Sequence, residues 1–231
     1  MTARRPFRVA TWNIHSAIGA DGRHDPERTL EGLRGLDADV TALQEVDSRI
    51  DGRDGFAEFE AAADHVAAAA KTIVADNGEY GHMLLSRWPI EHWTHHDLSV
   101  AGRERRSAID AVLDTGRGRL RVIATHLGLF LRERRHQVAV LGRLLDRQPG
   151  VPTIVLGDFN EPTGRGPASR RFDRALGRAG RWRTYPSRRP LLPLDRIWHS
   201  RDLDLVASGV VREARLASDH LPLVAEFAHP G

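Results

Sequence analysis

The segment Pro152–Asn160 constrains the fold of this chain more strongly than any other stretch of its sequence. Four residues suited to a buried strand lead into Gly157, and Asp158 and Asn160 then follow two positions apart. Because side chains alternate along an extended backbone, the acid and the amide face the same side and can both point into one cleft. Taken alone, the pattern fits a strand-ending turn equally well.

The same arrangement recurs at four other places, where a carboxylate, an amide or an imidazole stands next to an apolar run. The residues in these positions are Asn13 after Val9–Trp12, Glu45 after Val40–Gln44, His126 after Val122–Thr125, and Asp219-His220 ahead of Leu221–Val224. Each of them alone has an ordinary structural explanation, such as a turn residue, a surface acid or a core histidine. Five independent explanations of that kind are harder to accept than one shared site at the edge of a sheet.

Strand-like apolar runs and helix-like patterns are both spread along the chain. Strands are predicted near Phe7–Trp12, Asp39–Gln44, Thr72–Ala75, His82–Ser86, Ile109–Asp114, Leu120–Thr125, Thr153–Leu156, Asp195–His199, Leu203–Ser208 and Leu223–Phe227. Helices are predicted from Asp25-Pro26 through Leu36, over the alanine-rich Phe56–Ala70, and over Leu131–Arg147 with a stop at Pro149-Gly150. A hairpin loop is predicted at Asp114–Arg119. Strands joined partly by helices and partly by hairpins imply mixed sheets with the helices outside.

Composition sets limits on the class of protein. The 231 residues contain no internal repeat and no linker, so a single domain over residues 1–231 is expected. The absence of cysteine excludes disulfides and thiolate metal sites, so a metal ion would be held by oxygen or imidazole. No apolar run approaches the roughly 18 residues of a membrane helix, and Met1–Pro6 lacks the apolar core of a signal peptide. We therefore expect a soluble, monomeric protein of the cytoplasm.

Charge is distributed unevenly along the chain, although the net charge is only +3. The segment Glu161–Arg201 contains eleven arginines and three acidic residues. A basic segment beside a cleft would attract a substrate that carries phosphate. A solvated arginine-rich loop and helix would explain the same composition, so both interpretations stay open.

The residue types at the strand ends indicate hydrolysis by water. Glu45, Asp158, Asp195 and Asp219 offer hard oxygen ligands, which suit Mg²⁺ or Mn²⁺ better than zinc. No serine or cysteine nucleophile stands in a recognisable setting, and no phosphate-binding loop or dinucleotide fingerprint occurs. Catalysis by two carboxylates alone, as in glycosidases, would leave the histidines and asparagines unexplained.

Seven short motifs occur in a fixed order between Phe7 and Phe227. They are Thr11-Trp12-Asn13-Ile14-His15, Leu43-Gln44-Glu45-Val46, Leu84-Leu85-Ser86-Arg87, Ala124-Thr125-His126-Leu127, Gly157-Asp158-Phe159-Asn160, Leu194-Asp195-Arg196-Ile197 and Ser218-Asp219-His220-Leu221-Pro222. In this order they resemble the endonuclease/exonuclease/phosphatase superfamily, and most of all its compact bacterial metal-dependent hydrolases. Gly-Asp-Phe-Asn together with a terminal Ser-Asp-His is the most specific part of the resemblance.

The resemblance implies a fold and a metal site. The fold would be a four-layer α/β-sandwich, in which two mixed β-sheets pack face to face with helices outside. Glu45 would hold a divalent metal ion, Mg²⁺ or Mn²⁺, with Asn13 beside it. Asp219 would contribute to the same metal site. The residues themselves allow one metal ion or two.

The resemblance also implies catalytic roles. Asp158 would orient or deprotonate the attacking water, and Asn160 would position that water or the phosphate. His220, held by Asp195, would stabilise the charge that develops on the phosphoryl oxygens. His126 would contact the phosphate. Such an arrangement is physically coherent, because a buried acid beside an imidazole keeps the ring oriented and favours its protonated form.

Substrate contacts are less clearly marked than the catalytic residues. Members of the superfamily commonly have Gly-Asn where this chain has Gly81-His82, so either phosphate contact is weakened here or His82 replaces the amide. Arg105 and Arg106 are candidate phosphate contacts, although a hairpin surface is the commoner explanation. The chain also has little room for the inserted loops with which abasic-site enzymes grip duplex DNA.

The predicted function is therefore a Mg²⁺- or Mn²⁺-dependent phosphoesterase that cleaves a phosphodiester, with nucleic acid as the favoured substrate. Phospholipid or small-molecule phosphodiesters form one alternative, and phosphomonoesters of the inositol phosphatase type form another. A third alternative is a binding module that keeps the fold without turnover.

Overall fold

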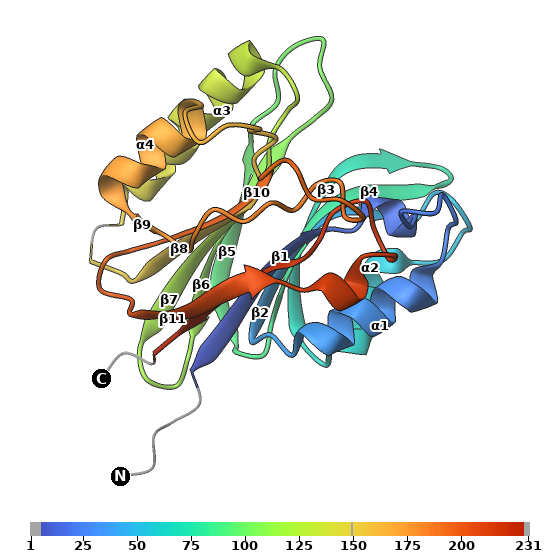
Figure 1. Cartoon of the computed structure of the whole chain (residues 1–231), viewed down its shortest axis with the longest axis horizontal. Helices are drawn as coiled ribbons and strands as arrows, with labels where there is room; N and C mark the ends of the chain where they lie inside the picture. Colours follow the sequence, from blue (N-terminus) through green and yellow to red (C-terminus); the bar gives the residue numbers. More distant parts are fainter. Residues whose placement is uncertain (1–5, 149, 229–231) are drawn as a thin grey trace.

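Two six-stranded sheets packed face to face form the centre of the molecule, and helices cover their outer faces (Figure 1). This computed structural model describes residues 6–148 and 150–228. The basic residues before Pro6 and the predicted helix stop at Pro149 lie outside the described residues. The strand order is β11-β12-β1-β2-β4-β3 in the first sheet and β5-β6-β7-β8-β10-β9 in the second. Both sheets are mixed, since β1 pairs in parallel with β2 and antiparallel with β12, and β7 pairs in parallel with β8.

Strands make up most of the regular structure in the described part of the chain. They are β1 (Phe7–Asn13), β2 (Val40–Asp47), β3 (Val66–Ala75), β4 (Gly78–Ser86), β5 (Ile90–Asp97), β6 (Ser107–Asp114), β7 (Arg119–His126), β8 (Thr153–Asp158), β9 (Gly177–Arg178), β10 (Asp195–His199), β11 (Leu205–Val210) and β12 (Leu223–Phe227). The α-helices are α1 (Pro26–Leu36), α2 (Gly55–Ala63), α3 (Leu131–Leu145) and α4 (Pro167–Ala175). Two short 3₁₀ segments, η1 (His15–Ala17) and η2 (Arg212–Ala214), lie in the connections.

The layer between the two sheets contains the main hydrophobic core. Alternate residues of each strand face this layer, as Phe7 and Val9 do on β1 and Ile154 and Leu156 on β8. Two further cores lie under the helices. α1 and α2 cover the first sheet, and α3 and α4 cover the second, through Leu30, Leu33, Phe56 and Phe59 on one side and Val138, Leu141 and Phe172 on the other. Removal of these apolar surfaces from water is the main force that holds the four layers together.

The predicted fold class is confirmed, and so is each of the ten predicted strands in its approximate position. The start of α1 also agrees with the prediction, since Pro26 is its first residue and Asp25 Oδ1 accepts a hydrogen bond from the Arg28 N–H (3.0 Å). The loop Asp114–Arg119 is the predicted hairpin, with its two ends paired between β6 and β7. Within residues 6–148 and 150–228, no helix combines the length and apolar character that crossing a bilayer requires.

The predicted helix over Phe56–Ala70 is wrong in its second half. The helix α2 ends at Ala63, where Asp64 adopts a left-handed backbone (φ 51°), and the alanines that follow belong to β3. Ala68 and Ala70 face the layer between the sheets, where their small side chains fit against the other sheet. Alanine prefers a helix by a fraction of a kcal/mol per residue, and strand pairing with β4 outweighs that preference.

One long strand, β5, was not predicted from the sequence. It forms the edge of the second sheet, pairs only with β6, and leaves most of its side chains exposed. An exposed edge strand lacks the apolar alternation on which strand prediction depends. Its composition, which includes three histidines, therefore carried no strand signal.

Candidate active site

Strands of both sheets end or begin at one edge of the sandwich. β1, β2, β7 and β8 run toward this edge, and β4, β6 and β10 run away from it because each is antiparallel to its neighbour. The registers place Asn13 beside Gln44, Gln44 beside His82, His126 beside Asp158, and Asp158 beside Asp195. A hydrogen bond from Asn13 Nδ2 to Asp158 Oδ2 (3.2 Å) joins the two sheets here. Residues far apart in the sequence thus lie side by side.

The polar cluster lies at this edge, where the apolar layer between the two sheets ends. Along β8, Ile154 and Leu156 belong to the core between the sheets, and Asp158 is the next residue on that face. Along β7, Ala124 is followed in the same way by His126. A strand whose inward face turns polar at its last position therefore places a polar side chain at the mouth of the layer.

The same alternation identifies three polar residues that the sequence-based prediction missed. They are Thr11 on β1, Gln44 on β2 and Ser107 on β6, and each stands two positions from a residue of the core between the sheets. All three are buried, and Thr11 Oγ1 donates a hydrogen bond to Gln44 Oε1 (3.2 Å). Counting two positions onward from each core residue would have found them.

Glu45 reaches the cluster by a different route. It follows Gln44 directly, so regular alternation would point its side chain toward the helices. A β-bulge in β2 and a left-handed backbone at Glu45 (φ 59°) turn the side chain toward the layer between the sheets. Its Oε1 accepts a hydrogen bond from Asn13 Nδ2 (2.8 Å) and lies 3.9 Å from His126 Nε2. Unfavourable backbone conformations of this kind cluster at functional sites.

Asp158 lies at the centre of the cluster and is only 1% exposed. Its Oδ1 accepts a hydrogen bond from the Asn160 N–H (2.8 Å), and its Oδ2 accepts one from Asn13 Nδ2. Burial, followed by the neighbouring charge of Asp195, raises the pKa of Asp158 to about 6. A carboxylate with a pKa just below neutrality is ionised at pH 7 and still basic enough to accept a proton.

The backbone explains why a glycine and an asparagine flank this acid. Gly157 has φ 147°, and a Cβ there would lie 1.9 Å from the carbonyl oxygen of Thr125, so only glycine fits. Asn160 has a left-handed backbone (φ 48°), which asparagine tolerates better than most residues. Its Nδ2 donates to the carbonyl of Leu127 (2.8 Å) and lies 3.2 Å from His126 Nε2.

His220 and Asp195 form a buried pair beside Asp158. The distance from His220 Nδ1 to Asp195 Oδ2 is 2.8 Å, and His220 Nε2 lies 3.8 Å from Asp158 Oδ2. Burial alone would lower the pKa of His220, but the charge of Asp195 and its hydrogen bond outweigh burial and raise the pKa to about 10. The imidazole is therefore protonated at neutral pH and points its Nε2–H toward the cluster.

His126 is held in the opposite charge state by Arg106. The Nη1 group of Arg106 donates to His126 Nδ1 (2.9 Å). Burial, followed by the positive charge of Arg106, keeps the pKa of His126 well below its usual value, so the ring is neutral. Both ring nitrogens of His126 face donors, Arg106 Nη1 at Nδ1 and Asn160 Nδ2 at Nε2 (3.2 Å), and a neutral ring accepts from only one of them. The shorter contact is that of Arg106, which leaves the ring proton on Nε2, 3.7 Å from Asp158 Oδ2. The cluster therefore contains one charged and one neutral imidazole donor.

His82, Arg105, Arg106 and Ser107 line one small cavity next to His126. The cavity has a volume of about 10 Å³. In the described part of the chain, His82 Nε2, Arg106 Nε and Ser107 Oγ are buried without a hydrogen-bond partner. Such atoms cost about 1–3 kcal/mol each when left unpaired, so the cavity is suited to a polar atom of a ligand. Arg105 itself is exposed.

Asp219 lies at the margin of the cluster. Its carboxylate contacts Ser218 Oγ (3.4 Å) and the Nδ1 atom of His15 (3.7 Å), and its side chain is 30% exposed. Ser218 Oγ donates to the backbone carbonyl of Asn13 (2.7 Å) and accepts from the His220 N–H (3.1 Å). The Ser-Asp-His motif thus fastens the loop before β12 to the end of β1.

Comparison with known proteins assigns this arrangement to a family. The model of the "Endonuclease/Exonuclease/phosphatase family" matches residues 10–220, a range that contains every residue of the cluster. The chain belongs to the endonuclease/exonuclease/phosphatase family. Members of this family hydrolyse phosphoesters, and the chain is accordingly a phosphoester hydrolase.

Three known proteins are similar to this chain in sequence or in fold. The "Uncharacterized protein YbhP" of Escherichia coli (strain K12) is 32% identical over an alignment of 251 positions, gaps included, that covers 98% of each chain. A crystal structure of an endonuclease/exonuclease/phosphatase from Beutenbergia cavernae DSM 12333 is 25% identical, has a TM-score of 0.77, and covers 99% of this chain and 72% of that chain. The human Nocturnin catalytic domain with bound sulfate anion, at 24% identity and a TM-score of 0.76, covers 97% and 94% and shares the fold.

Enzymes of this family generally use divalent metal ions, and two groups of residues in the cluster offer ligands. The first group is the carboxylates of Glu45 and Asp158, which share the Asn13 amide between them. Two carboxylates held this close repel each other, and a divalent cation would relieve the repulsion. Oxygen donors of this type suit Mg²⁺ or Mn²⁺.

The second group is Asp158, Asp195 and His220, whose nearest ligand atoms all lie within 4.8 Å of one another. His220, however, directs its Nδ1 at Asp195 (2.8 Å), and its pKa is raised to about 10, so a metal ion at Nε2 would have to displace a proton. The group that contains Glu45 therefore fits a divalent ion better.

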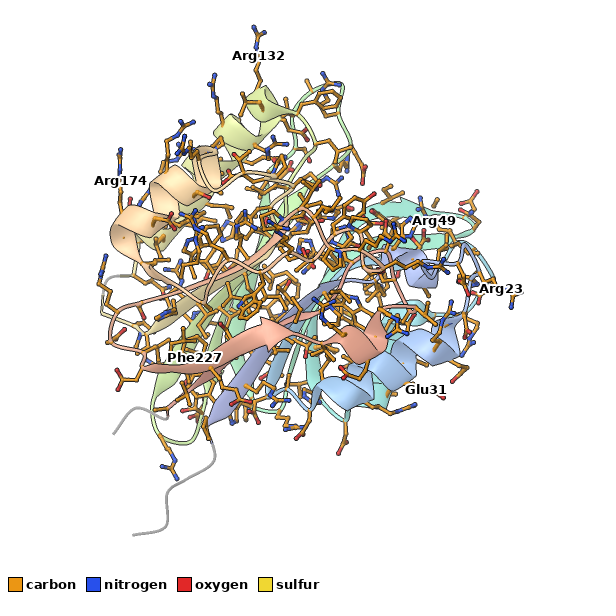
Figure 2. The ribbon with its side chains drawn as sticks, in the orientation of Figure 1. Arg23, Glu31, Arg49, Arg132, Arg174 and Phe227 are labelled. Atoms are coloured by element: carbon orange, nitrogen blue, oxygen red, sulfur yellow. The ribbon has the colours of Figure 1, made fainter. Side chains whose placement is uncertain are left out.

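The arginine-rich segment Glu161–Arg201 is partly occupied by structural contacts. Arg171 pairs with Asp146, the residue that follows α3, and Arg178 pairs with Asp173. Arg196 is buried and donates to the Glu161 carbonyl (3.0 Å). Figure 2 shows Arg174 projecting outward from α4, away from the sheets. The other seven arginines of the segment are exposed, namely Arg165, Arg170, Arg181, Arg183, Arg188, Arg189 and Arg201. The segment therefore stays basic at its surface, and its charge does not separate a nucleic-acid substrate from an anionic lipid.

Proposed function

We propose that this protein is a Mg²⁺- or Mn²⁺-dependent hydrolase that cleaves a phosphodiester by direct attack of water. The observation that carries the proposal is the surroundings of the buried Asp158 carboxylate. It lies 3.7 Å from His126 Nε2 and 3.8 Å from His220 Nε2, and shares the Asn13 amide with Glu45. A base, two imidazole donors and a second carboxylate around one point are suited to water attack on a phosphate ester.

Asp158 accepts the proton of the attacking water in this proposal. Its pKa of about 6, raised by burial and by Asp195, leaves it ionised and basic at neutral pH. Asn160 positions the water or a phosphate oxygen, since its amide is already oriented by the Leu127 carbonyl (2.8 Å). An oriented base and an oriented nucleophile lower the entropic part of the barrier.

The two imidazoles stabilise the phosphoryl oxygens in different ways. His220 donates from a charged ring, which Asp195 keeps protonated, and so opposes the negative charge that develops during attack. His126 donates from a neutral ring, because Arg106 occupies its Nδ1. Fixed donors of this kind need no reorganisation during the reaction.

Glu45 holds the divalent ion in this proposal, with Asn13 beside it, and Asp219 contributes from the margin. Asn13 acts here through its Nδ2 group, because its Oδ1 accepts a hydrogen bond from the His15 N–H (2.9 Å). When bound, the ion neutralises the phosphate and stabilises the leaving oxygen. Asn13 also keeps the carboxylates of Glu45 and Asp158 apart at a fixed distance, since its Nδ2 donates to both. We assign the cavity of His82, Arg105 and Arg106 to an oxygen atom of the substrate.

The proposal names one reaction, hydrolysis of a phosphodiester, and several classes of substrate for it. The arginine-rich segment favours a polyanionic substrate, and its seven exposed arginines suit nucleic acid and anionic phospholipid alike. Lipid and small-molecule phosphodiesters are therefore proposed as substrates together with nucleic acid. A panel of plasmid DNA, single strands, RNA, sphingomyelin, glycerophosphodiesters and inositol phosphates separates these classes. The monomeric state and the cytoplasmic location predicted from the sequence belong to the same proposal.

Chelation of divalent ions is the first test. Hydrolysis of bis-p-nitrophenyl phosphate should fall to background in EDTA and return when Mg²⁺ or Mn²⁺ is added in excess, because the oxygen ligands of the cluster fit these ions. Thermal unfolding in EDTA serves as the control that the protein stays folded. Full activity in EDTA would rule out a metal-dependent reaction, and no turnover with any metal ion would favour a binding module.

The pH profile of Asp195→Asn provides a second test. Activity of the wild type should rise as Asp158 ionises through a pKa of about 6 and fall as His220 deprotonates through a pKa of about 10. Removal of the Asp195 charge lowers both pKa values, because that charge raises each of them. Both limbs of the kcat profile should therefore move to lower pH. A profile with unchanged limbs would show that Asp195 does not act through these two groups.

A further inference from the structure

The loop between β7 and α3 presents three consecutive apolar side chains to solvent. Leu129, Phe130 and Leu131 are 65%, 51% and 46% exposed. Single exposed apolar residues are ordinary, whereas a contiguous group calls for an explanation. Leu127, two residues before Leu129, accepts the hydrogen bond that orients Asn160, so the group lies at the rim of the candidate active site.

Folding alone does not account for these residues. Phe130 stands at the N-cap of α3, a position where serine, threonine, aspartate or asparagine would accept a hydrogen bond from the first turn. Phenylalanine has no side-chain acceptor, and the side chains of Leu129, Phe130 and Leu131 are not buried in any of the cores. A local rule broken without a structural gain is typical of a functional site.

The backbone of this loop is nevertheless firmly held. Gly128 N–H donates to Gln137 Oε1 (2.9 Å), and the buried Arg134 donates to the carbonyls of Gly128 (3.2 Å) and Leu129 (2.5 Å). A Cβ at Gly128 would lie 1.8 Å from the Glu133 carboxyl carbon, so the Glu133 side chain could not keep its present position beside any other residue. The three apolar side chains therefore extend from a backbone that hydrogen bonds hold in place.

Arginines surround the apolar group. The sequence Arg-Glu-Arg-Arg occurs twice, at Arg103–Arg106 and at Arg132–Arg135. Arg103 stacks on the Phe130 ring, with its guanidinium carbon 3.8 Å from the ring centroid. Arg103, Arg105, Arg132 and Arg135 are all exposed, and the exposed acids near them are Glu104 and Asp97. Figure 2 shows Arg132 projecting into solvent from the start of α3.

We propose that Leu129, Phe130 and Leu131, with these four exposed arginines, form a surface that docks on an anionic lipid bilayer beside the active site. Apolar side chains that enter the headgroup region, flanked by arginines that meet anionic headgroups, are the combination by which peripheral proteins bind membranes. Leucine has no π-face for a nucleic-acid base, and Arg103 already covers the Phe130 ring. Three side chains are also too few for a stable protein interface, which involves roughly 20–30 residues a side.

This inference goes beyond the proposed hydrolysis, because membrane binding needs no turnover. The test is co-sedimentation of the intact protein with vesicles of phosphatidylcholine alone and of phosphatidylcholine with phosphatidylglycerol. The wild type should partition onto the anionic vesicles, less so at high salt. The double variant Leu129→Ser/Phe130→Ser should lose at least about tenfold in partition coefficient.

Matched controls separate docking from chemistry and from folding. Val74→Ser, at a 71% exposed valine of β3, should leave vesicle binding unchanged. The double variant should hydrolyse soluble bis-p-nitrophenyl phosphate as the wild type does. Co-sedimentation then reports on membrane docking, and the hydrolysis assay reports separately on the proposed activity. The proposal is overturned if the wild type does not co-sediment with anionic vesicles, or if the double variant binds them as well as the wild type does. Loss of oligonucleotide binding by the double variant, without any vesicle binding, would reassign the surface to nucleic acid.

Discussion

Asp158→Asn is expected to lower kcat for bis-p-nitrophenyl phosphate by about 10³-fold, with little change in KM. The amide has the same shape as the acid and can still accept the hydrogen bond from the Asn160 N–H through its oxygen. It cannot accept a proton from water at any pH in the working range. The acid limb of the pH profile, attributed to the ionisation of Asp158, should disappear along with most of the activity.

Protein stability provides the control for this variant. Asp158 is buried, and burial raises its pKa to about 6, so the charged form is disfavoured in its site. A neutral amide avoids the cost of burying a charge, but its N–H group then meets Asn13 Nδ2, which is also a donor. Because the two effects oppose each other, the melting temperature should stay within a few degrees of the wild-type value. Asp146→Asn, at an exposed acid that pairs with Arg171 on the outer helices, is the matched variant and should keep full activity. Substantial turnover by Asp158→Asn would remove this residue from the role of base.

Glu45→Gln is expected to raise the Mg²⁺ concentration needed for half-maximal activity by at least about 100-fold, and to weaken Mn²⁺ binding measured by calorimetry to a similar degree. The substitution retains the shape of the side chain and an oxygen that accepts from Asn13 Nδ2 (2.8 Å in the wild type). It removes one of the two negative charges that face each other across Asn13. Activity should recover in part at saturating metal, since Asp158, His220 and His126 are unchanged.

Glu45→Gln also distinguishes between the two groups of residues that could hold the metal ion. An ion held instead by Asp158, Asp195 and His220 would respond weakly to Glu45→Gln and strongly to His220→Gln. Glu31→Gln is the matched control, because Glu31 is exposed on α1 and belongs to neither group of ligands (Figure 2). An unchanged metal requirement in Glu45→Gln, with a raised one in His220→Gln, would move the site to the second group.

The positions of the catalytic candidates were readable from the sequence because they depend on local rules. Alternation along a strand has a period of two, so an apolar run that ends in Asn13, His126 or Asp158 indicates a polar side chain at the mouth of a sheet. The order of the motifs then specified the family and with it the layer architecture. Helix signals such as Asp25-Pro26 were equally local, and α1 begins where they predict.

Only the tertiary structure decided the features that depend on pairing between distant segments. The alanines after Ala63 form a strand because β4 offers them hydrogen bonds and the opposite sheet leaves room for small side chains, although isolated alanines prefer a helix. Glu45 faces the cluster because a bulge and a left-handed backbone reverse its direction, which alternation alone would predict wrongly.

The charge states of the site, and its surroundings, are likewise tertiary properties. His220 and His126 are both histidines at strand or loop ends, yet Asp195 keeps one protonated and Arg106 keeps the other neutral. The three exposed apolar residues from Leu129 to Leu131 resemble part of a core in the sequence, and their exposure is visible only once the chain is folded. The sequence by itself determined which residues can do chemistry, because that follows from side-chain type and strand period. The fold decided how they are charged and what surrounds them, because burial and neighbouring charge arise only when distant segments meet.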